Sequence, residues 1–165
     1  MYALGRLGPI DVEVAHALVA SCGRALRDRL GLSHWEPPYA RERMIEEATT
    51  REVWLVSDGA TPVATFTLGA DPIAPYPDSV FDPAVPAIYL NRLAVAPARW
   101  GNGIGTFCLR EVEGRARAVG ARAVRFDAAS AHHRLCSFYQ RLGYADRGPA
   151  RVGTTDVRCF EKRVA

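Results

Sequence analysis

The chain has little of what several protein classes require. Its four cysteines are scattered through 165 residues with no Cys-x-x-Cys pair, so we expect no metal site. No Lys/Arg-rich run is interleaved with aromatic residues and the net charge is only +3, so nucleic acid is not an expected partner. No apolar run approaches membrane-spanning length and the N-terminus lacks the apolar core of a signal peptide, which favours a cytoplasmic protein without a membrane partner.

What remains is the composition of an ordinary globular domain. Hydrophobic residues make up 48% of the chain and charged residues 24%, and the length predicts one domain over residues 1–165. The changes in apolar period predict the order β-α-α-β-β-β-α-β-α-β-β, a mixed α/β layout with a central sheet flanked by helices. These features leave open whether the chain forms a homodimer.

The N-terminal third predicts a strand over residues 2–7 and then two helices. Pro9 introduces the first helix with Asp11 as its N-cap, an apolar stripe runs as far as Leu30, and Gly31 ends it. Further on, residues 69–86 contain five prolines and predict a long irregular loop. Long loops in compact domains usually serve a function, and we interpret this one as a flap bordering a substrate pocket.

The rest of the chain is organised around residues 90–109, LNRLAVAPARWGNGIGTFCL. A strand ends at Pro97, Gly101, Gly103 and Gly105 alternate through a tight loop, and apolar residues four apart then predict a helix. This order directs free backbone N–H groups and the positive end of a helix dipole at one spot. The pattern predicts a cradle for phosphate or another anion, and a plain turn before a helix is the alternative.

Two phosphate-binding motifs do not fit this loop. A P-loop requires Lys-Ser or Lys-Thr after its last glycine, and Thr106-Phe107 stands there. A dinucleotide fingerprint requires a third Gly or Ala, and the two ways of counting place Thr106 or Cys108 at that position. Asp127 lies at a suitable distance for a ribose ligand, but only 38 residues follow it, too few for the rest of a doubly wound sheet.

The segment from Leu93 to Gly105 resembles the acyl-CoA-binding motif of the GNAT superfamily of N-acyltransferases: a strand ending in hydrophobic-Ala-Val-x-Pro, then a loop of alternating glycines that begins with Arg or Gln. Residues 137–144, SFYQRLGY, are similar to the second signature of that family. There are two departures. Trp100 occupies the Arg/Gln position, and His132 stands where the family often has Asn.

The resemblance implies a fold and an activity. The fold is a mostly antiparallel central sheet, splayed at the cofactor site and flanked by helices. The cofactor is acetyl-CoA or another acyl-CoA. The activity is direct transfer of the acetyl group, in a ternary complex, to a primary amine of a small molecule or peptide. Two alternatives stay open: a non-catalytic acyl-CoA-binding or regulatory domain, and an acyltransferase whose donor is a carrier protein or a tRNA.

The resemblance also assigns roles to residues. Tyr139 stands at the general-acid position, and Asp127 is the first candidate for the base, although it could merely pair with Arg92 or Arg125. The cofactor contacts fall on Leu93, Ala94, Val95, Arg99, Trp100, Gly101, Asn102, Gly103, Ile104, Gly105, Thr106 and His132. The candidate substrate contacts are Trp35, Glu36, Tyr39, Tyr76 and Asn91, of which Glu36 and Asn91, the latter through a water, are also alternatives for the base.

Overall fold

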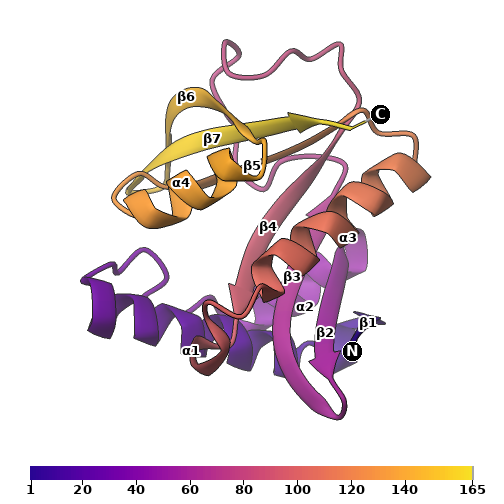
Figure 1. Ribbon diagram of the computed structural model, residues 1–165, viewed down its shortest axis with the longest axis vertical. Helices are drawn as coiled ribbons and strands as arrows, with labels where there is room; N and C mark the ends of the chain where they lie inside the picture. Colours follow the sequence, from indigo (N-terminus) through magenta and orange to yellow (C-terminus); the bar gives the residue numbers. More distant parts are fainter. Residues whose placement is uncertain (165) are drawn as a thin grey trace. The chain divides into compact units, whose positions relative to one another are not determined.

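The computed structural model describes residues 1–164, which divide into two compact units. The first unit comprises Met1–Gly69 and Arg92–Leu109, and the second comprises Ala70–Asn91 and the chain from Arg110 onward. Strand β4 (Ala87–Val95) and helix α3 (Ile104–Ala118) each contribute to both units. Figure 1 follows the chain from β4 through a short loop into α3.

Three antiparallel strands and the second half of β4 form the sheet of the first unit. Strand β1 (Tyr2–Leu7) pairs with β2 (Glu52–Asp58), and β2 pairs with β3 (Thr61–Gly69). The Asp58-Gly59 turn joins β2 to β3, with Gly59 in the left-handed region at φ 60°. On the other side of β3, the N–H of Ala96, just after β4, donates to the Val63 carbonyl oxygen at 2.8 Å.

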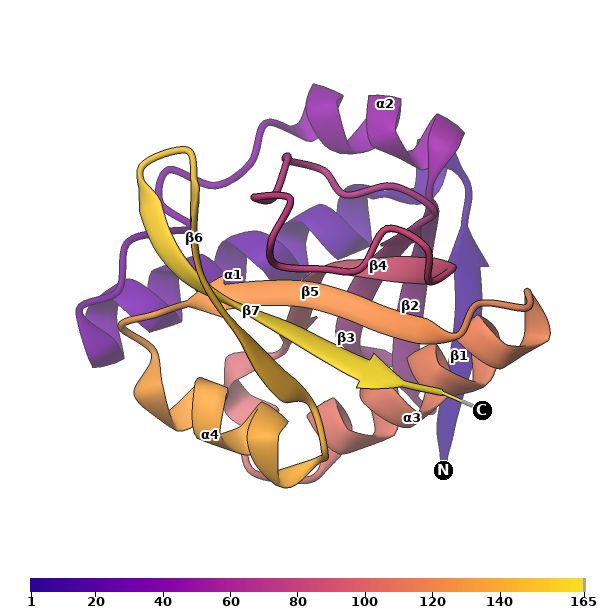
Figure 2. The same cartoon turned by 90° about the horizontal axis from the view of Figure 1, so that it is seen from above.

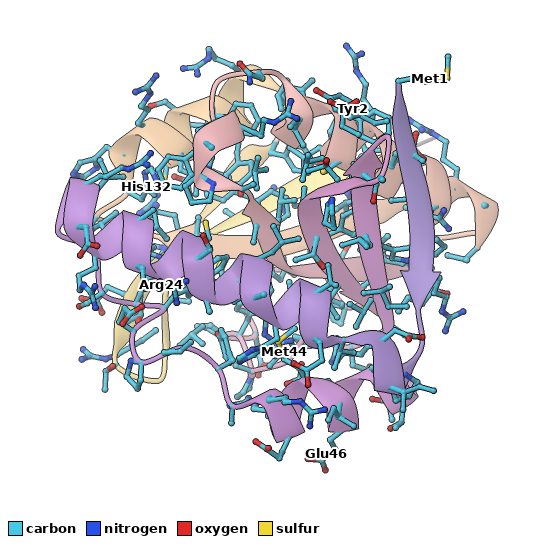
Figure 3. The ribbon with its side chains drawn as sticks, turned by 90° about the horizontal axis from the view of Figure 1, so that it is seen from below. Met1, Tyr2, Arg24, Met44, Glu46 and His132 are labelled. Atoms are coloured by element: carbon cyan, nitrogen blue, oxygen red, sulfur yellow. The ribbon has the colours of Figure 1, made fainter. Side chains whose placement is uncertain are left out.

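Helices α1 (Glu13–Leu30) and α2 (Arg41–Thr50) bury their apolar faces in one hydrophobic cluster, here called the α1 cluster. Positions three and four apart on α1 face the same side of the helix, which is why the predicted stripe is buried there. Met44 points inward from α2 whereas Glu46 points away (Figure 3). The buried members of the α1 cluster are Ala15, Val19, Cys22, Leu26, Met44, Val53 and Ala94.

Two details predicted for α1 are wrong. Asp11 does not cap the helix, because Pro9–Asp11 form a separate 3-10 turn in which the Asp11 N–H donates to the Gly8 carbonyl at 3.0 Å. The N-cap of α1 is therefore Val12, which makes no side-chain cap hydrogen bond. Leu30 is 50% exposed, since it lies in the last turn, just before Gly31 ends the helix at φ 67°.

In the second unit β5 (Ala123–Ala129) lies between the first half of β4 and β7 (Thr155–Arg163). The β4–β5 pair is parallel, β5–β7 is antiparallel, and β7 pairs antiparallel with β6 (Ala145–Val152) across the two-residue turn 153–154. The strand order is therefore β1-β2-β3-β4-β5-β7-β6, and β4–β5 is the one parallel pair among the pairs whose register is described. The predicted order of elements and the mostly antiparallel mixed sheet with four helices are confirmed.

Helix α4 (His133–Arg141) belongs to the second unit, and its Tyr139 packs in an aromatic core. The Tyr139 ring centroid lies 4.6 Å from that of Phe126 and 5.4 Å from that of Phe160.

No helix among residues 1–164 combines the length and the hydropathy that crossing a membrane takes.

The proline-rich segment 70–86, also in the second unit, contains no helix or strand, as predicted (Figure 2). It is nevertheless anchored, because Val80 and Phe81 are buried against β7 residues such as Val157. Tyr76 of the segment and Tyr89 of β4 pack against the same cluster.

Candidate active site

The first half of the candidate site lies on β4 and the loop after it. The parallel register with β5 covers only Ala87–Tyr89, and β4 continues to Val95. Arg92 has φ 50°, a conformation that is rare for a residue with a side chain and that interrupts the extended strand. Its guanidinium is buried, forms an ion pair with Glu47 of α2, and lies 4.4 Å from the Tyr39 ring centre.

The predicted cradle has the expected backbone geometry. Gly101 and Gly103 have φ 86° and 78°, in the left-handed region that favours glycine, and both are exposed. The Phe107 N–H donates to the Gly103 carbonyl at 3.0 Å, so the N–H groups from Gly103 to Thr106 have no acceptor within the helix. Free N–H groups at an exposed helix start suit a diphosphate.

Trp100, the main departure from the family motif, turns its indole toward α1. The indole Nε1–H donates to the Val95 carbonyl at 2.8 Å, the ring packs against the α1 cluster, and the Arg29 guanidinium lies 5.3 Å from a ring centre. Residues 101–103 remain exposed, so the indole does not cover the cradle. The neighbouring Arg99 donates through Nη1 to Asp58 at 3.3 Å.

The predicted substrate residues of the loop between α1 and α2 lie against the same core. Trp35 and Tyr39 both pack on the α1 cluster, which includes Ala94 of β4. Trp35 is fitted closely to α1, because a Cβ added at Gly23 would lie 2.7 Å from its carbonyl oxygen. Glu36 accepts from Arg27 at 3.0 Å through Oε2, whereas its Oε1 is buried with no hydrogen-bond partner among the described residues.

The second unit brings Asp127 together with Tyr76, two residues that the sequence proposed for different roles. The Tyr76 hydroxyl donates to Asp127 Oδ2 at 2.6 Å. Burial raises the pKa of the Asp127 carboxyl above its ordinary value, and the Tyr76 hydrogen bond offsets part of that rise. Arg125, one of the two arginines considered as ion-pair partners, pairs instead with Glu161 at 2.8 Å.

Three further predicted residues lie in the second unit. Tyr139 is only 5% exposed and is held among aromatic rings, and its carbonyl accepts from the Tyr144 N–H at 3.1 Å. His132 is the N-cap of α4, with Nδ1 accepting from the Leu135 N–H at 3.3 Å, and burial lowers the pKa of its imidazole. Asn91 Oδ1 is buried without a hydrogen-bond partner in the described chain, so it can accept a bond from a ligand N–H.

The sequence did not reveal the buried ion pairs. Arg125 and Glu161 are 3% and 4% exposed, and Arg92 is buried beside Glu47. A charged residue on a strand usually predicts a solvent-facing side chain, so the residue types alone did not indicate that these charges are buried. No group of three or more metal-ligating side chains occurs in residues 1–164, and all four cysteines are free thiols.

Comparisons with known proteins identify the family. The model of the acetyltransferase (GNAT) family matches residues 21–144, and the chain belongs to this family. It is accordingly an N-acetyltransferase that uses acetyl-CoA. No curated protein matches the sequence significantly.

Solved structures share the fold. A GNAT-family protein from Desulfovibrio desulfuricans superposes with a TM-score of 0.73 at 19% identity, over all of both chains. The PaiA N-acetyltransferase of Thermoplasma acidophilum, solved with coenzyme A, gives 0.74 at 16% identity over 99% of both chains. The ribosomal-protein-S18-alanine N-acetyltransferase of Escherichia coli gives 0.74 at 11% identity, over all of this chain and 95% of that one.

Proposed function

We propose that this protein transfers the acetyl group of acetyl-CoA directly to a primary amine of a small molecule or peptide, with both bound in a ternary complex. The carrying observation is the turn at 101–106, where two exposed left-handed glycines precede a helix whose first N–H groups are free. Acetyl-CoA supplies an activated thioester when bound. Four free cysteines fit a reducing compartment such as the cytoplasm.

The residues that would hold the donor come from the end of β4 and from the loop that leads into α3. The backbone of Leu93, Ala94 and Val95 would bind the pantetheine arm, and the free N–H groups from Gly103 to Thr106 would bind the diphosphate. The Val95 carbonyl already accepts from the Trp100 indole. We therefore assign to Trp100 the role of fixing the loop to β4, in place of a direct side-chain contact with phosphate.

Asp127 and Tyr139 carry the proton transfers in this proposal. An acceptor amine must lose a proton before it attacks, and a buried carboxylate with a raised pKa is a stronger base than an exposed one. The leaving thiolate needs a proton, which a phenol at Tyr139 can donate. Asn91 Oδ1, which lacks a partner, is suited to accept an N–H of the acceptor. Cys22 and Cys159 are poor nucleophiles, since burial raises the pKa of Cys22 to about 11 and that of Cys159 to about 12.

The diphosphate cradle can be tested with two matched glycine substitutions. A Cβ at Gly103 meets nothing within 4 Å, so Gly103→Ala acts only by disfavouring φ 78° and thereby disturbing the turn. Gly114→Ala, in the middle of α3, also meets nothing within 4 Å and should stabilise the helix by about 0.5–1 kcal/mol.

We expect Gly103→Ala to weaken acetyl-CoA binding at least tenfold by calorimetry, and Gly114→Ala to leave the dissociation constant unchanged. Thiol release with a panel of primary amines then measures transfer. Binding without release on any amine would instead support a non-catalytic acyl-CoA-binding domain, and no binding of free acetyl-CoA would support a carrier-protein or tRNA donor. Equal affinity of both variants would refute the cradle.

A further inference from the structure

A pocket in the second unit is lined in part by Tyr76, a predicted substrate residue, and its other lining residues indicate which kind of acceptor it suits. Its volume is about 200 Å³, and it opens between the proline-rich segment, β4 and β5. Figure 2 shows the segment beside these two strands. The lining residues are Pro72, Tyr76, Pro77, Asp78, Phe81, Pro83, Tyr89 and Arg125.

Three aromatic rings form the walls. Tyr76 and Tyr89 are nearly parallel, with centroids 6.3 Å apart and 20° between their planes. Phe81 stands edge-on to both, at 87° to Tyr76 and 74° to Tyr89. With three prolines completing the lining, the pocket offers flat apolar surfaces, which suit another ring. Apolar cavities of roughly 150 Å³ hold a benzene ring, so this volume is sufficient.

The one buried charge in the lining is already satisfied. The Arg125 guanidinium donates to Glu161 at 2.8 Å, to the Tyr89 hydroxyl at 3.2 Å and to the Asp82 carbonyl at 2.7 Å. It also lies 4.9 Å from the Phe81 ring centre, so it occupies the place that a cationic ligand would take against that ring. A ligand carboxylate therefore finds no uncompensated cation there, while the exposed Asp78 favours an approaching ammonium group.

The pocket is joined to the proposed base through one residue. The Tyr76 ring lines the pocket, and its hydroxyl donates to Asp127 at 2.6 Å. A ligand ring stacked on Tyr76 thus lies about one phenol length from the Asp127 carboxylate. A short alkyl linker on that ring carries an amine toward the carboxylate, which can take its proton.

We propose that this pocket binds the ring of the acceptor and that the acceptor is an aryl-alkyl primary amine without a carboxylate. The inference rests on the proposed N-acetyltransferase function and specifies its substrate class. In the transfer, the amine nitrogen forms the amide bond with the acetyl carbon and its proton passes to Asp127. The carbon–sulfur bond of acetyl-CoA breaks, and the leaving thiolate takes a proton from the Tyr139 hydroxyl and departs as coenzyme A.

Three probes with saturating acetyl-CoA test the inference: 2-phenylethylamine, butylamine and phenylalanine. We expect kcat/KM for 2-phenylethylamine to exceed that for each of the other two at least tenfold, because only this probe buries a ring without bringing a carboxylate. Direct binding of 2-phenylethylamine, followed by ligand-observed NMR without donor, gives a readout that does not depend on transfer.

Phe81→Ala removes one wall and should lower kcat/KM for 2-phenylethylamine at least tenfold while changing that for butylamine less than twofold. Phe81→Leu keeps more of the packing against Val157 and should give a smaller loss, which guards against an effect of misfolding. Ser79→Ala, at an exposed position of the same segment outside the lining, is the matched control and should change nothing.

The outcomes separate the two proposals. Equal turnover of 2-phenylethylamine and butylamine, or an equal effect of Phe81→Ala on both, overturns the pocket assignment and leaves the acetyltransferase function standing. Equal turnover of phenylalanine and 2-phenylethylamine overturns the exclusion of carboxylates. Acetyl-CoA binding without transfer to any amine overturns the proposed function and the acceptor role together, whatever the NMR experiment shows.

Discussion

The hydrogen bond from Tyr76 to Asp127 can be removed by deleting a single oxygen atom, the Tyr76 hydroxyl. In Tyr76→Phe the ring keeps its place between Phe81 and Tyr89, and only the donor to Asp127 Oδ2 at 2.6 Å is lost. Since that hydrogen bond lowers the carboxyl pKa, its loss raises the pKa further above the ordinary value. The substitution therefore tests whether this carboxylate is the base.

The magnitude follows from the difference between two kinds of hydrogen bond. A bond to an ionised group contributes about 1.5–3 kcal/mol and a neutral one about 0.5–1.5 kcal/mol, so the ionised form of Asp127 loses roughly 1–1.5 kcal/mol more than the protonated form. The pKa of Asp127 should therefore rise further above its ordinary value in Tyr76→Phe.

The sign for stability follows from the direction of the shift. The folded-state pKa of Asp127 is raised above its unfolded value, so its contribution to stability is fully present below the unfolded pKa and is lost as pH rises through the folded pKa. Tyr76→Phe raises the folded pKa further and extends that loss to higher pH. The variant should thus lose about 1.5–3 kcal/mol where Asp127 is ionised and about 0.5–1.5 kcal/mol in acid, where Asp127 is protonated, so the loss should grow as pH rises.

The assay is the pH dependence of kcat/KM with saturating acetyl-CoA, together with urea unfolding at pH 8 and in acid. Tyr89→Phe is the matched control, because the Tyr89 hydroxyl accepts from Arg125 at 3.2 Å and makes no bond to Asp127. We expect the acidic limb of the rate profile to move to higher pH in Tyr76→Phe and to stay in place in Tyr89→Phe. An unmoved limb in Tyr76→Phe would show that Asp127 is not the base.

Two further substitutions test the acid and the packing of the first unit. Tyr139→Phe keeps a ring in contact with Phe126, and kcat should fall at least about 100-fold at unchanged affinity for acetyl-CoA. A normal kcat would remove Tyr139 from the mechanism. Gly23→Ala places a Cβ 2.7 Å from the Trp35 carbonyl, and urea unfolding should show a loss of about 1–3 kcal/mol, whereas an unchanged midpoint would mean that the loop can shift without cost.

The order of helices and strands could be predicted because each element is specified largely by residues that are close together in the sequence. The proline at position 97, the four-residue spacing in α3 and the glycine at position 31 each specify an element or its end. The Asp11 cap failed because Pro9 begins a separate 3-10 turn, a choice between two neighbouring turns that the residue types do not decide.

The part of the candidate site that the backbone forms could be predicted from the sequence. The part that depends on contacts between distant side chains could not. The glycine loop follows from residue order alone, since positive φ and free N–H groups are local properties. The contact between Tyr76 and Asp127 joins residues 51 positions apart and depends on how the proline-rich segment folds. The aromatic pocket depends on the same segment, for which periodicity gives no information.

Two neighbouring residues of β4 depart from what is usual in a strand, and these departures support the proposed donor site. Asn91 has a buried oxygen without a partner among the described residues, and Arg92 combines φ 50° with a buried guanidinium. Backbone conformations of this kind cost about 1–3 kcal/mol and persist where the surroundings hold them, most often at functional sites. Here the Glu47 carboxylate and the Tyr39 ring hold Arg92. β-branched residues are the ones that favour a strand, and position 92 has an arginine instead. This strained arginine comes just before residues 93–95, whose backbone is proposed to bind the donor. We therefore infer that Arg92 is retained for the shape that it imposes on this backbone.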